Sequence, residues 1–295
     1  MADYTVIGHI AVDRVISAYE DRVQIGGSPT YASLAARGMA GKIEAITKVG
    51  SDISEDHVSQ LKRIGLDIRE DIVKDATTTK FVLDYSIPER RLRVEGVCVD
   101  ILPSDVIEAT GAVLLSPIVG EIPQQTYSRI DAEVLALDPQ GFVREVQRDG
   151  AIKHRAWYDG DLLQRTQIFK SSERELRLIT QETDCLKGLK KLTGLGIEVT
   201  VATKGQEGAT LMTDSGAFDV PSVEDIAVRD PTGAGDVFMG CFFQAYLEGE
   251  DPIWCACMGS ALASGVVETV GPRIELSVNE VNERAEGLYD RVVKV

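Results

Sequence analysis

Short apolar runs alternate with segments of helical period along most of this chain. Apolar runs predict six buried strands, at residues 4–10, 43–49, 112–116, 134–138, 167–170 and 198–203. The helical period predicts helices at residues 29–40, 55–64, 183–193 and 233–248, with two more within 252–291. This order is typical of βα units around a mostly parallel sheet, so we expect an α/β fold.

Two stretches interrupt this rhythm and predict a separate small sheet. Within residues 77–99, Phe81, Leu83 and Tyr85 alternate with residues of the opposite face, and a second alternating run follows a turn at 88–90, as in an antiparallel ribbon. The extended piece at 12–25 is expected to pair with this ribbon. We therefore expect lid strands at about 12–25 and 77–99, inserted into a single domain that spans residues 1–295. The apolar face of such a lid covers either a ligand or a partner subunit, and the second case gives a homodimer.

Composition and charge restrict the partners of this fold. The 295 residues include 31 Lys and Arg against 47 Asp and Glu, a formal charge of −16. This charge disfavours nucleic acid and anionic membranes, because both need a cationic binding surface. The longest uncharged run, residues 252–267, is too short and too rich in small residues to span a bilayer. Five cysteines, an odd number, and no N-terminal signal segment predict a cytoplasmic location.

The segment 230–236, Asp-Pro-Thr-Gly-Ala-Gly-Asp, stands at the head of an apolar helical run. Gly233 and Gly235 let the backbone approach a ligand closely, and a helix that begins there directs unpaired N–H groups outward. The pattern predicts an anion site made of the amides of Gly233, Ala234 and Gly235, which needs no net basic charge. Asp236 would repel a phosphate bound there. That conflict is resolved if Asp236 accepts a proton from a hydroxyl group that attacks the phosphate.

This heptad resembles the second signature of the ribokinase-like carbohydrate kinases, the PfkB family. The N-terminal third is similar to the first signature of the family. Residues 25–38 supply a pair of glycines and a helix of small residues, and residues 49–52 supply a strand and a Gly-x-Asp loop. The resemblance extends from about residue 4 to residue 272. It implies a ribokinase-like three-layer α/β/α fold, with a mostly parallel central sheet and a small β lid.

The resemblance also implies a reaction, the transfer of the γ-phosphoryl group of ATP to an alcohol group with the help of Mg²⁺. Asp236 would be the base, and the amides of residues 233–235 would stabilise charge on the transferred group. Glu175, in a segment similar to the Asn-x-x-Glu element of the family, would place the magnesium ion through water molecules. We expect the substrate to be bound by Asp13, Gly26, Gly27, Thr30, Asp138 and Gln140. We expect the nucleotide to be bound by Ser172, Thr203, Lys204, Gly205, Gly208, Thr232 and Ser264.

The loop that holds Asp138 and Gln140 has two possible interpretations, and Thr30 and Ser172 depart from the residues that the family usually has. Residues 138–144 leave a strand at the carboxyl end of the sheet, where open α/β sheets bind ligands. They form either a substrate-side or phosphate-side loop, or an ordinary strand exit with a Pro-Gln-Gly turn. Thr30 and Ser172 stand where the family often has Asn. Because Asn occurs only at positions 279 and 282, we interpret both as a matter of composition, since a hydroxyl group also donates and accepts hydrogen bonds.

The acceptor class is open between several small molecules. The loops at 26–33, 138–141 and 266–272 resemble the myo-inositol kinase branch, which favours a sugar or polyol. The alternatives are a nucleoside kinase of the same family, for which Phe81 or Tyr85 would stack on the base, and a non-catalytic sensor that binds sugar or nucleotide. Retention of both Asp236 and Glu175 argues against the sensor. The P-loop motif GxxxxGK[ST] and the dinucleotide-binding motif GxGxxG are both absent from the sequence. The sequence therefore does not favour a P-loop NTPase or a dinucleotide oxidoreductase.

Overall fold

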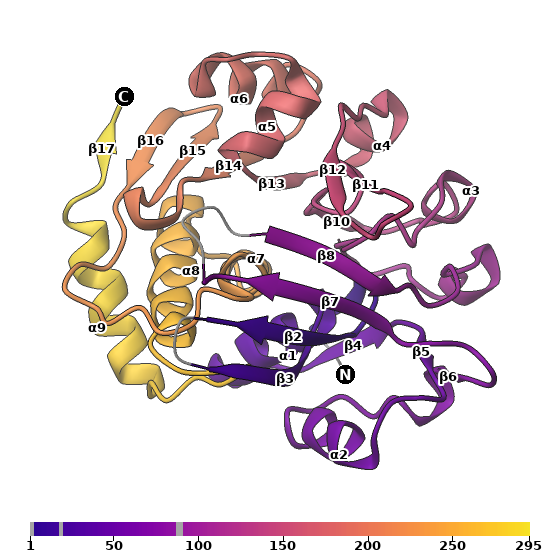
Figure 1. Cartoon of the computed structure of the whole chain (residues 1–295). Coiled ribbons are helices and arrows are strands. Elements are labelled where there is room, and N and C mark those ends of the chain that lie inside the picture. The colour runs from indigo at the N-terminus through magenta and orange to yellow at the C-terminus, as the bar shows by residue number, and fades with distance from the viewer. Residues whose placement is uncertain (1–2, 18–19, 87–90) are drawn as a thin grey trace.

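A nine-stranded sheet forms the centre of the described part of the chain, residues 3–17, 20–86 and 91–295, in a computed structural model (Figure 1). The turn predicted at 88–90 lies outside the described residues. Six neighbouring strands run parallel, and they are β4 (Ile43–Ile46), β1 (Tyr4–Ile7), β9 (Ala112–Leu115), β10 (Val134–Leu137), β13 (Ile168–Ser172) and β14 (Val199–Thr203). All six correspond to the predicted strands, so the mostly parallel sheet is confirmed.

The sheet continues beyond β14 with antiparallel strands that the sequence pattern did not predict. They are β15 (Ala209–Thr213), β16 (Gly216–Val220) and β17 (Val293–Lys294). The hairpin of β15 and β16 turns through residues 214–215, Asp-Ser, which lack the Asn-Gly or Asp-Gly pair that marks a hairpin most clearly.

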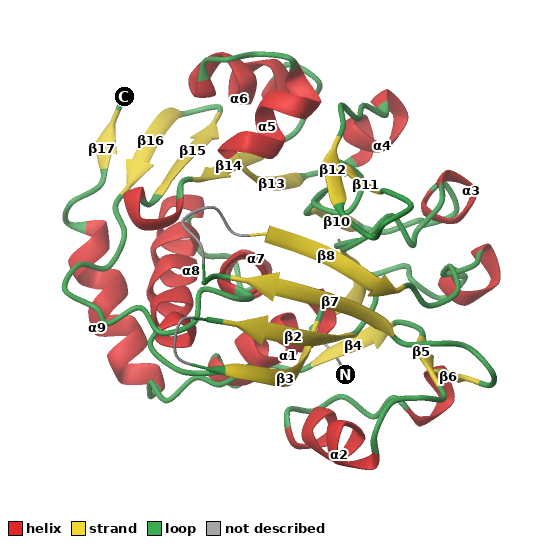
Figure 2. Cartoon of the chain, viewed as in Figure 1, coloured by secondary structure: helices red, strands yellow, loops and turns green. Residues whose placement is uncertain are grey.

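Helices cover both faces of the sheet, as Figure 2 shows. One face carries α1 (Ser28–Gly38), α2 (Glu55–Arg63), α7 (Ala234–Leu247), α8 (Pro252–Val267) and α9 (Val278–Tyr289). The opposite face carries α3 (Gln124–Tyr127), α4 (Gly160–Arg165), α5 (Glu173–Thr180) and α6 (Cys185–Thr193). Successive side chains of a strand point to opposite faces of the sheet, so each strand contributes to the hydrophobic core on both faces. For example, Val6 packs in the core under the first set of helices and Ile7 in the core under the second set. The predicted three-layer α/β/α arrangement and the six predicted helices are confirmed.

A second, four-stranded sheet stands in front of α1 and α7 (Figure 1). We call it the small sheet, and its strands are β3 (Asp21–Gly26), β2 (Ala11–Ile16), β7 (Thr79–Asp84) and β8 (Arg91–Gly96). The antiparallel ribbon of β7 and β8 is as predicted, whereas residues 11–26 form a hairpin of two strands rather than one extended piece. The inward side chains of Phe81, Leu83 and Val94 pack against Ile118 and Val119 of the main body.

Short elements complete the chain. They are the strand pairs β5 (Val49–Gly50) with β6 (Ile72–Val73) and β11 (Arg144–Val146) with β12 (Ile152–His154), and the 3₁₀ turns Arg69–Asp71, Pro103–Val106 and Gly205–Glu207. Across the described residues, the helices are too short or too polar to cross a membrane.

Strand order locates the ligand crevice of this fold. The first strand, β1, has β4 on one side and β9 on the other, so the chain reverses its winding direction beside β1. In open α/β sheets, ligands bind outside the carboxyl ends of the strands at such a point. The segments that follow β1, β9, β10, β13 and β14 all emerge at this edge, and the small sheet begins there.

Candidate functional site

The N-terminus of α7 lies at the centre of this crevice. Gly233 precedes the helix with φ 79°, in the left-handed region, and no side chain caps it. Only glycine fits, because a Cβ atom at this position would collide with the ring of Tyr31. The first N–H groups of α7 and the positive end of its dipole are therefore presented to the crevice, which is the geometry of an anion site.

Asp236 lies in the first turn of α7, where two donors hold its carboxylate. Its Oδ1 atom accepts hydrogen bonds from Gln140 Nε2 at 2.7 Å and from Ser28 Oγ at 2.9 Å. Ser116 Oγ in turn donates to Ser28 Oγ at 2.8 Å. The carboxylate is thus fixed by side chains from α1 and from the segments that follow β9 and β10.

One cavity, which we call the lid pocket, lies between this carboxylate and the small sheet. Its volume is about 80 Å³. Among the predicted site residues, Asp13, Gly27, Gln140, Thr232, Gly233 and Asp236 line it together. The remaining walls are Tyr31, Phe81, Leu83, Leu92, Ile118 and Arg144. The lid pocket is thus a largely apolar chamber with carboxylates at Asp13 and Asp236.

A wider cavity, which we call the groove, lies on the other side of the same loop. It encloses about 660 Å³ between the 3₁₀ turn Gly205–Glu207, α7 and α8, and its walls include the predicted nucleotide residues Thr203, Gly205, Gly208 and Ser264. Ala234 and Gly235 also line the groove, while Gly233 and Asp236 line the lid pocket. The loop at 230–236 therefore separates two cavities and contributes backbone or side chains to each.

Comparison with known proteins identifies the fold and the chemistry. Residues 140–279 match the family described as pfkB family carbohydrate kinase. A cytidine kinase of Thermococcus kodakarensis is 25% identical over 92% of this chain and 98% of its own. An inositol 3-kinase of Oryza sativa subsp. japonica is 26% identical over 91% of this chain and 67% of its own. The chain is thus similar to pfkB carbohydrate kinases over residues 140–279, and to a nucleoside kinase and an inositol kinase over most of its length, and it is a kinase.

Solved structures show the fold of this kinase. A pyrophosphate-dependent kinase in the ribokinase family, complexed with a pyrophosphate analogue and myo-inositol, has a TM-score of 0.77 at 21% identity, covering 95% of this chain and 99% of its own. A putative ribokinase II from E. coli, in complex with ATP and Mg²⁺, has a TM-score of 0.75 at 18% identity, covering 97% and 100%. This kinase therefore has the ribokinase fold.

A buried lysine of this kinase, absent from the predicted site, lies under the anion-site loop. Lys170 Nζ bonds Asp138 Oδ2 at 2.7 Å, and their side chains are 6% and 0% exposed. A Cβ atom on Gly235 would lie 3.0 Å from Lys170 Nζ, so the ammonium group is directly beneath that residue. Burial opposes its charge, but the carboxylates of Asp138, Asp236 and Glu175 outweigh burial and raise the pKa of Lys170. The lysine stays protonated and supplies positive charge beside the amides.

A second unpredicted residue, Arg144, lines the lid pocket of this kinase. Its Nη2 donates to Gln140 Oε1 at 2.8 Å and its Nη1 to the carbonyl oxygen of Ile118 at 2.7 Å. Because Gln140 also donates to Asp236, the guanidinium group orients the amide that holds this carboxylate. The sequence signal for Lys170 is a single basic side chain at the end of an apolar strand, whereas Arg144 closes the segment 138–144 that was a candidate substrate-side or phosphate-side loop.

Several predicted residues support the site from behind its walls. Thr30 is fully buried and donates to the carbonyl oxygen of Gly26 at 2.7 Å. A Cβ atom on Gly26 would collide with the Asp13 carboxylate, so glycine makes room for that side chain. Asp138 is covered completely, so the structure places it beneath the pocket rather than on its surface. Lys204 bonds Asp219 at 3.2 Å, on the outer side of β16.

Ser172 and Glu175 of this kinase form a capping box at the start of α5. Glu175 Oε2 accepts hydrogen bonds from the backbone N–H of Ser172 at 2.8 Å and from its Oγ at 2.7 Å. Burial opposes ionisation, but Lys170, Arg144 and these hydrogen bonds lower the pKa of Glu175. Within the described residues, no three His, Cys, Asp or Glu side chains gather at a metal-binding distance. This donor set fits Mg²⁺, which usually binds through one or two carboxylates, water and substrate phosphates.

Proposed function

We propose that this kinase transfers the γ-phosphoryl group of ATP to a hydroxyl group of a small polyol resembling myo-inositol. The observation that carries the proposal is the position of the loop at 230–236 between the two cavities. The acceptor occupies the lid pocket, on the side of Asp236, and ATP occupies the groove, on the side of Gly235. The amides between these residues face the position at which the two substrates meet.

Asp236 accepts the proton of the acceptor hydroxyl as its oxygen bonds the γ-phosphorus and the bond from that phosphorus to the bridging oxygen of ADP breaks. Gln140 and Ser28 fix the carboxylate in a single orientation. The amides of residues 233–235 stabilise the charge of the transferred group, and Lys170 reinforces them from below. Positioning of the reactants accounts for most of the acceleration, because a loose transition state needs little basic assistance.

Mg²⁺ neutralises phosphate charge when it is bound, and Glu175 is the residue that we propose to hold it through water. The Ser172 contacts set the orientation of Glu175, and the charges of Lys170 and Arg144 outweigh burial and, with the Ser172 hydrogen bonds, lower its pKa. Of the residues predicted to contact the nucleotide, we propose that Ser172, Thr203, Lys204, Gly205, Gly208 and Ser264 contact ATP, whereas Thr232 lines the lid pocket on the acceptor side. Four of them line the groove together, which supports this assignment.

The acceptor hydroxyl groups meet Asp13, Gln140 and Arg144, and the apolar wall of the small sheet packs on the ring. Polar groups at one end and apolar groups at the other suit a cyclic polyol, whose ring carries hydroxyl groups at its edge and C–H bonds on its faces. A nucleoside acceptor is the second candidate. It is favoured by Phe81, whose aromatic ring lines the pocket and offers a surface for a base.

A screen of ATP consumption against myo-inositol, ribose, fructose, 2-keto-3-deoxygluconate, cytidine and adenosine tests the proposal. We expect turnover with myo-inositol, and turnover with cytidine alone would select the nucleoside alternative. If none is consumed but one raises the melting temperature, the protein is a sensor rather than a catalyst.

Asp236→Asn tests the role of the base. We expect turnover to fall by about 100- to 10,000-fold, while the affinity for ATP stays within about threefold. Asp214→Asn, in the exposed hairpin turn, is the matched control and should keep full turnover. Near-normal turnover of the Asp236→Asn variant would contradict the assignment.

A further inference from the structure

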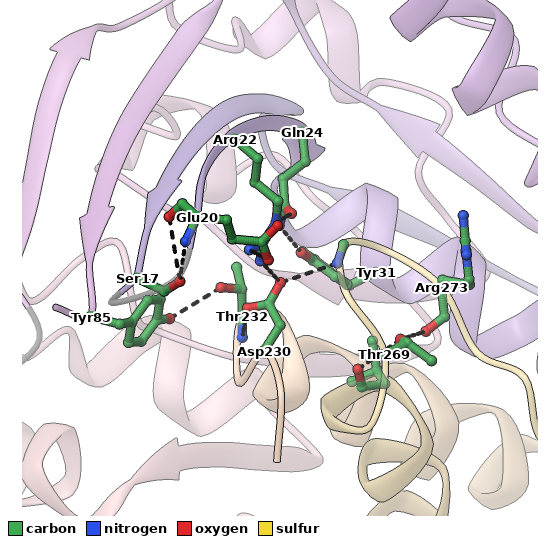
Figure 3. Close-up of polar contacts among 12 residues, drawn as sticks. Ser17, Glu20, Arg22, Gln24, Tyr31, Tyr85, Asp230, Thr232, Thr269 and Arg273 are labelled. Carbon is green, nitrogen blue, oxygen red and sulfur yellow. Dashed lines mark hydrogen bonds and ion pairs between the residues drawn. The ribbon is translucent and has the colours of Figure 1, made fainter. Parts of the chain in front are cut away.

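An arginine of the small sheet reaches across to the anion-site loop (Figure 3). Arg22, on β3, forms an ion pair between its Nη2 and Asp230 Oδ2, at the first residue of the Asp-Pro-Thr-Gly-Ala-Gly-Asp segment. The side chains are 16% and 2% exposed, in contrast to Arg14 and Asp21 on the same sheet, which are 50% and 47% exposed. Screening by solvent is therefore weak for the Arg22 pair and strong for the Arg14 pair.

Neighbouring side chains orient the Arg22 guanidinium group before it reaches the loop. Its Nε donates to Gln24 Oε1 at 3.0 Å and its Nη1 to Glu20 Oε1 at 2.6 Å. Gln24 Nε2 donates in turn to the hydroxyl oxygen of Tyr31 at 3.3 Å, and the Tyr31 ring lies against Gly233. The small sheet thus contacts the loop both through Arg22 and, indirectly, through Tyr31.

The Asp230 carboxylate that pairs with Arg22 also binds backbone N–H groups of the loop and of a neighbouring segment. Its Oδ1 accepts a hydrogen bond from the N–H of Thr232 at 3.0 Å, and its Oδ2 accepts one from the N–H of Gly271 at 3.2 Å. The carboxylate therefore fixes the turn that leads directly into Gly233. A shift of Asp230 would move the Thr232 backbone and, with it, the amides that follow.

The same sheet also covers the lid pocket. Phe81 and Leu83 of β7 line the pocket, and Tyr85, two residues further on, bonds Thr232 Oγ1 through its hydroxyl group at 3.1 Å. Figure 3 shows Tyr85 and Arg22 approaching the loop from the small sheet on either side of Thr232. The surface that touches the acceptor and the side chains that hold the loop thus belong to one element.

We propose that Arg22 is a positioning residue for phosphoryl transfer, which holds the anion-site amides in their working geometry through Asp230 and couples them to the sheet that covers the acceptor. This inference rests on the proposed role of the amides of residues 233–235. Arg22 lies outside the set of residues that line the lid pocket and the groove, so its removal should change the rate of transfer and not the affinity for either substrate.

Steady-state kinetics of Arg22→Ala and of the matched control Arg14→Ala test this proposal, with ATP and whichever of myo-inositol or cytidine the wild type consumes. We expect kcat of Arg22→Ala to fall about 100-fold, because a displacement of about 1 Å at a reacting group costs that much. Both KM values should stay within about threefold of the wild type. Arg14→Ala should keep full kcat.

Chemical rescue distinguishes positioning from a general loss of structure. Guanidinium chloride at a concentration well below its denaturing range should restore kcat of Arg22→Ala at least about tenfold, and sodium chloride at the same ionic strength should not. If Arg22→Ala does not fold, Arg22→Gln, which keeps a donor and removes the charge, takes its place in the same comparison.

A kcat of Arg22→Ala equal to that of Arg14→Ala overturns the proposal, as does a loss of kcat that guanidinium does not rescue. These results are separable from failure of the proposed function. If the wild type consumes no acceptor, or if Asp236→Asn keeps full turnover, the proposed function fails. If the wild type is active, Asp236→Asn is inactive and Arg22→Ala is fully active, only the role of Arg22 fails.

Discussion

Replacement of Lys170 by methionine isolates the energetic contribution of the ion pair beneath the anion-site loop. Methionine retains the length and the apolar stem but leaves the Asp138 carboxylate, which is 0% exposed, without its cation. Loss of one partner of a buried pair costs about 3–5 kcal/mol, because the remaining charge stays uncompensated. An unfolding entropy of about 2.1 cal/mol/K per residue gives about 0.6 kcal/mol/K for 295 residues. The melting temperature should therefore fall by about 5–8 °C.

Differential scanning calorimetry measures this shift, with two variants for comparison. Arg291→Met breaks an ion pair with Glu224 whose side chains are 42% and 72% exposed, and should lower the melting temperature by less than about 2 °C. The double variant Lys170→Met/Asp138→Leu removes both charges and should recover at least half of the loss. The reasoning is refuted if Lys170→Met and Arg291→Met melt together, or if the double variant is no more stable than Lys170→Met.

Two further predictions follow from the same region. Gly233→Ala should lower both kcat and the melting temperature, because its Cβ atom would collide with Tyr31. Gly249→Ala, at a similar φ but with open space around it, should lower only the melting temperature. Equal kcat values of the two variants would contradict this prediction. Burial raises the pKa of the Asp138 carboxyl above its usual range, and Glu175 and Asp236 add to this against the opposing charge of Lys170. A raised folded-state pKa gives stability that is fully present below the unfolded-state pKa and is lost as pH rises through the folded-state pKa. The melting temperature of the wild type should therefore exceed that of Asp138→Asn by more at about pH 5 than at about pH 8. A difference in melting temperature that grows with pH would contradict the assignment.

Local sequence patterns predicted those parts of the fold that are encoded locally. The strand ending at residue 7 is marked by its own apolar residues, and the start of α7 by a glycine pair before a long apolar run. Asp236 was predicted as a catalytic residue because a carboxylate beside a predicted anion site contradicts simple electrostatics unless it has a chemical role, and the structure places it in the wall of the lid pocket. In both cases the information lies within a few consecutive residues.

The remaining features depend on contacts between distant segments. Lys170 looked like an ordinary charged residue in a strand, and only the parallel pairing of β13 with β10 places it beside Asp138, 32 positions earlier. Arg22 and Asp230 are 208 positions apart, and no periodicity links them. The segment within residues 11–26 was expected as one extended piece, and only the pairing of Ala11 with Gly26 through Ile16 with Asp21 shows that it is a hairpin.

The net charge of −16 affects how charged molecules approach the surface of this kinase, whereas the binding of a phosphate depends on the groups in direct contact with it. Charges on the surface are screened over about 8 Å at physiological ionic strength, so they repel an extended polyanion that must lie along that surface. At the phosphate site that we propose, the N-terminus of α7 instead presents amide dipoles, with the Lys170 ammonium beneath Gly235. Three carboxylates, Asp138, Glu175 and Asp236, keep this lysine charged despite its burial. The acidic residues around the proposed phosphate site therefore keep its cation charged, so the net negative charge of the chain does not argue against an anionic substrate there.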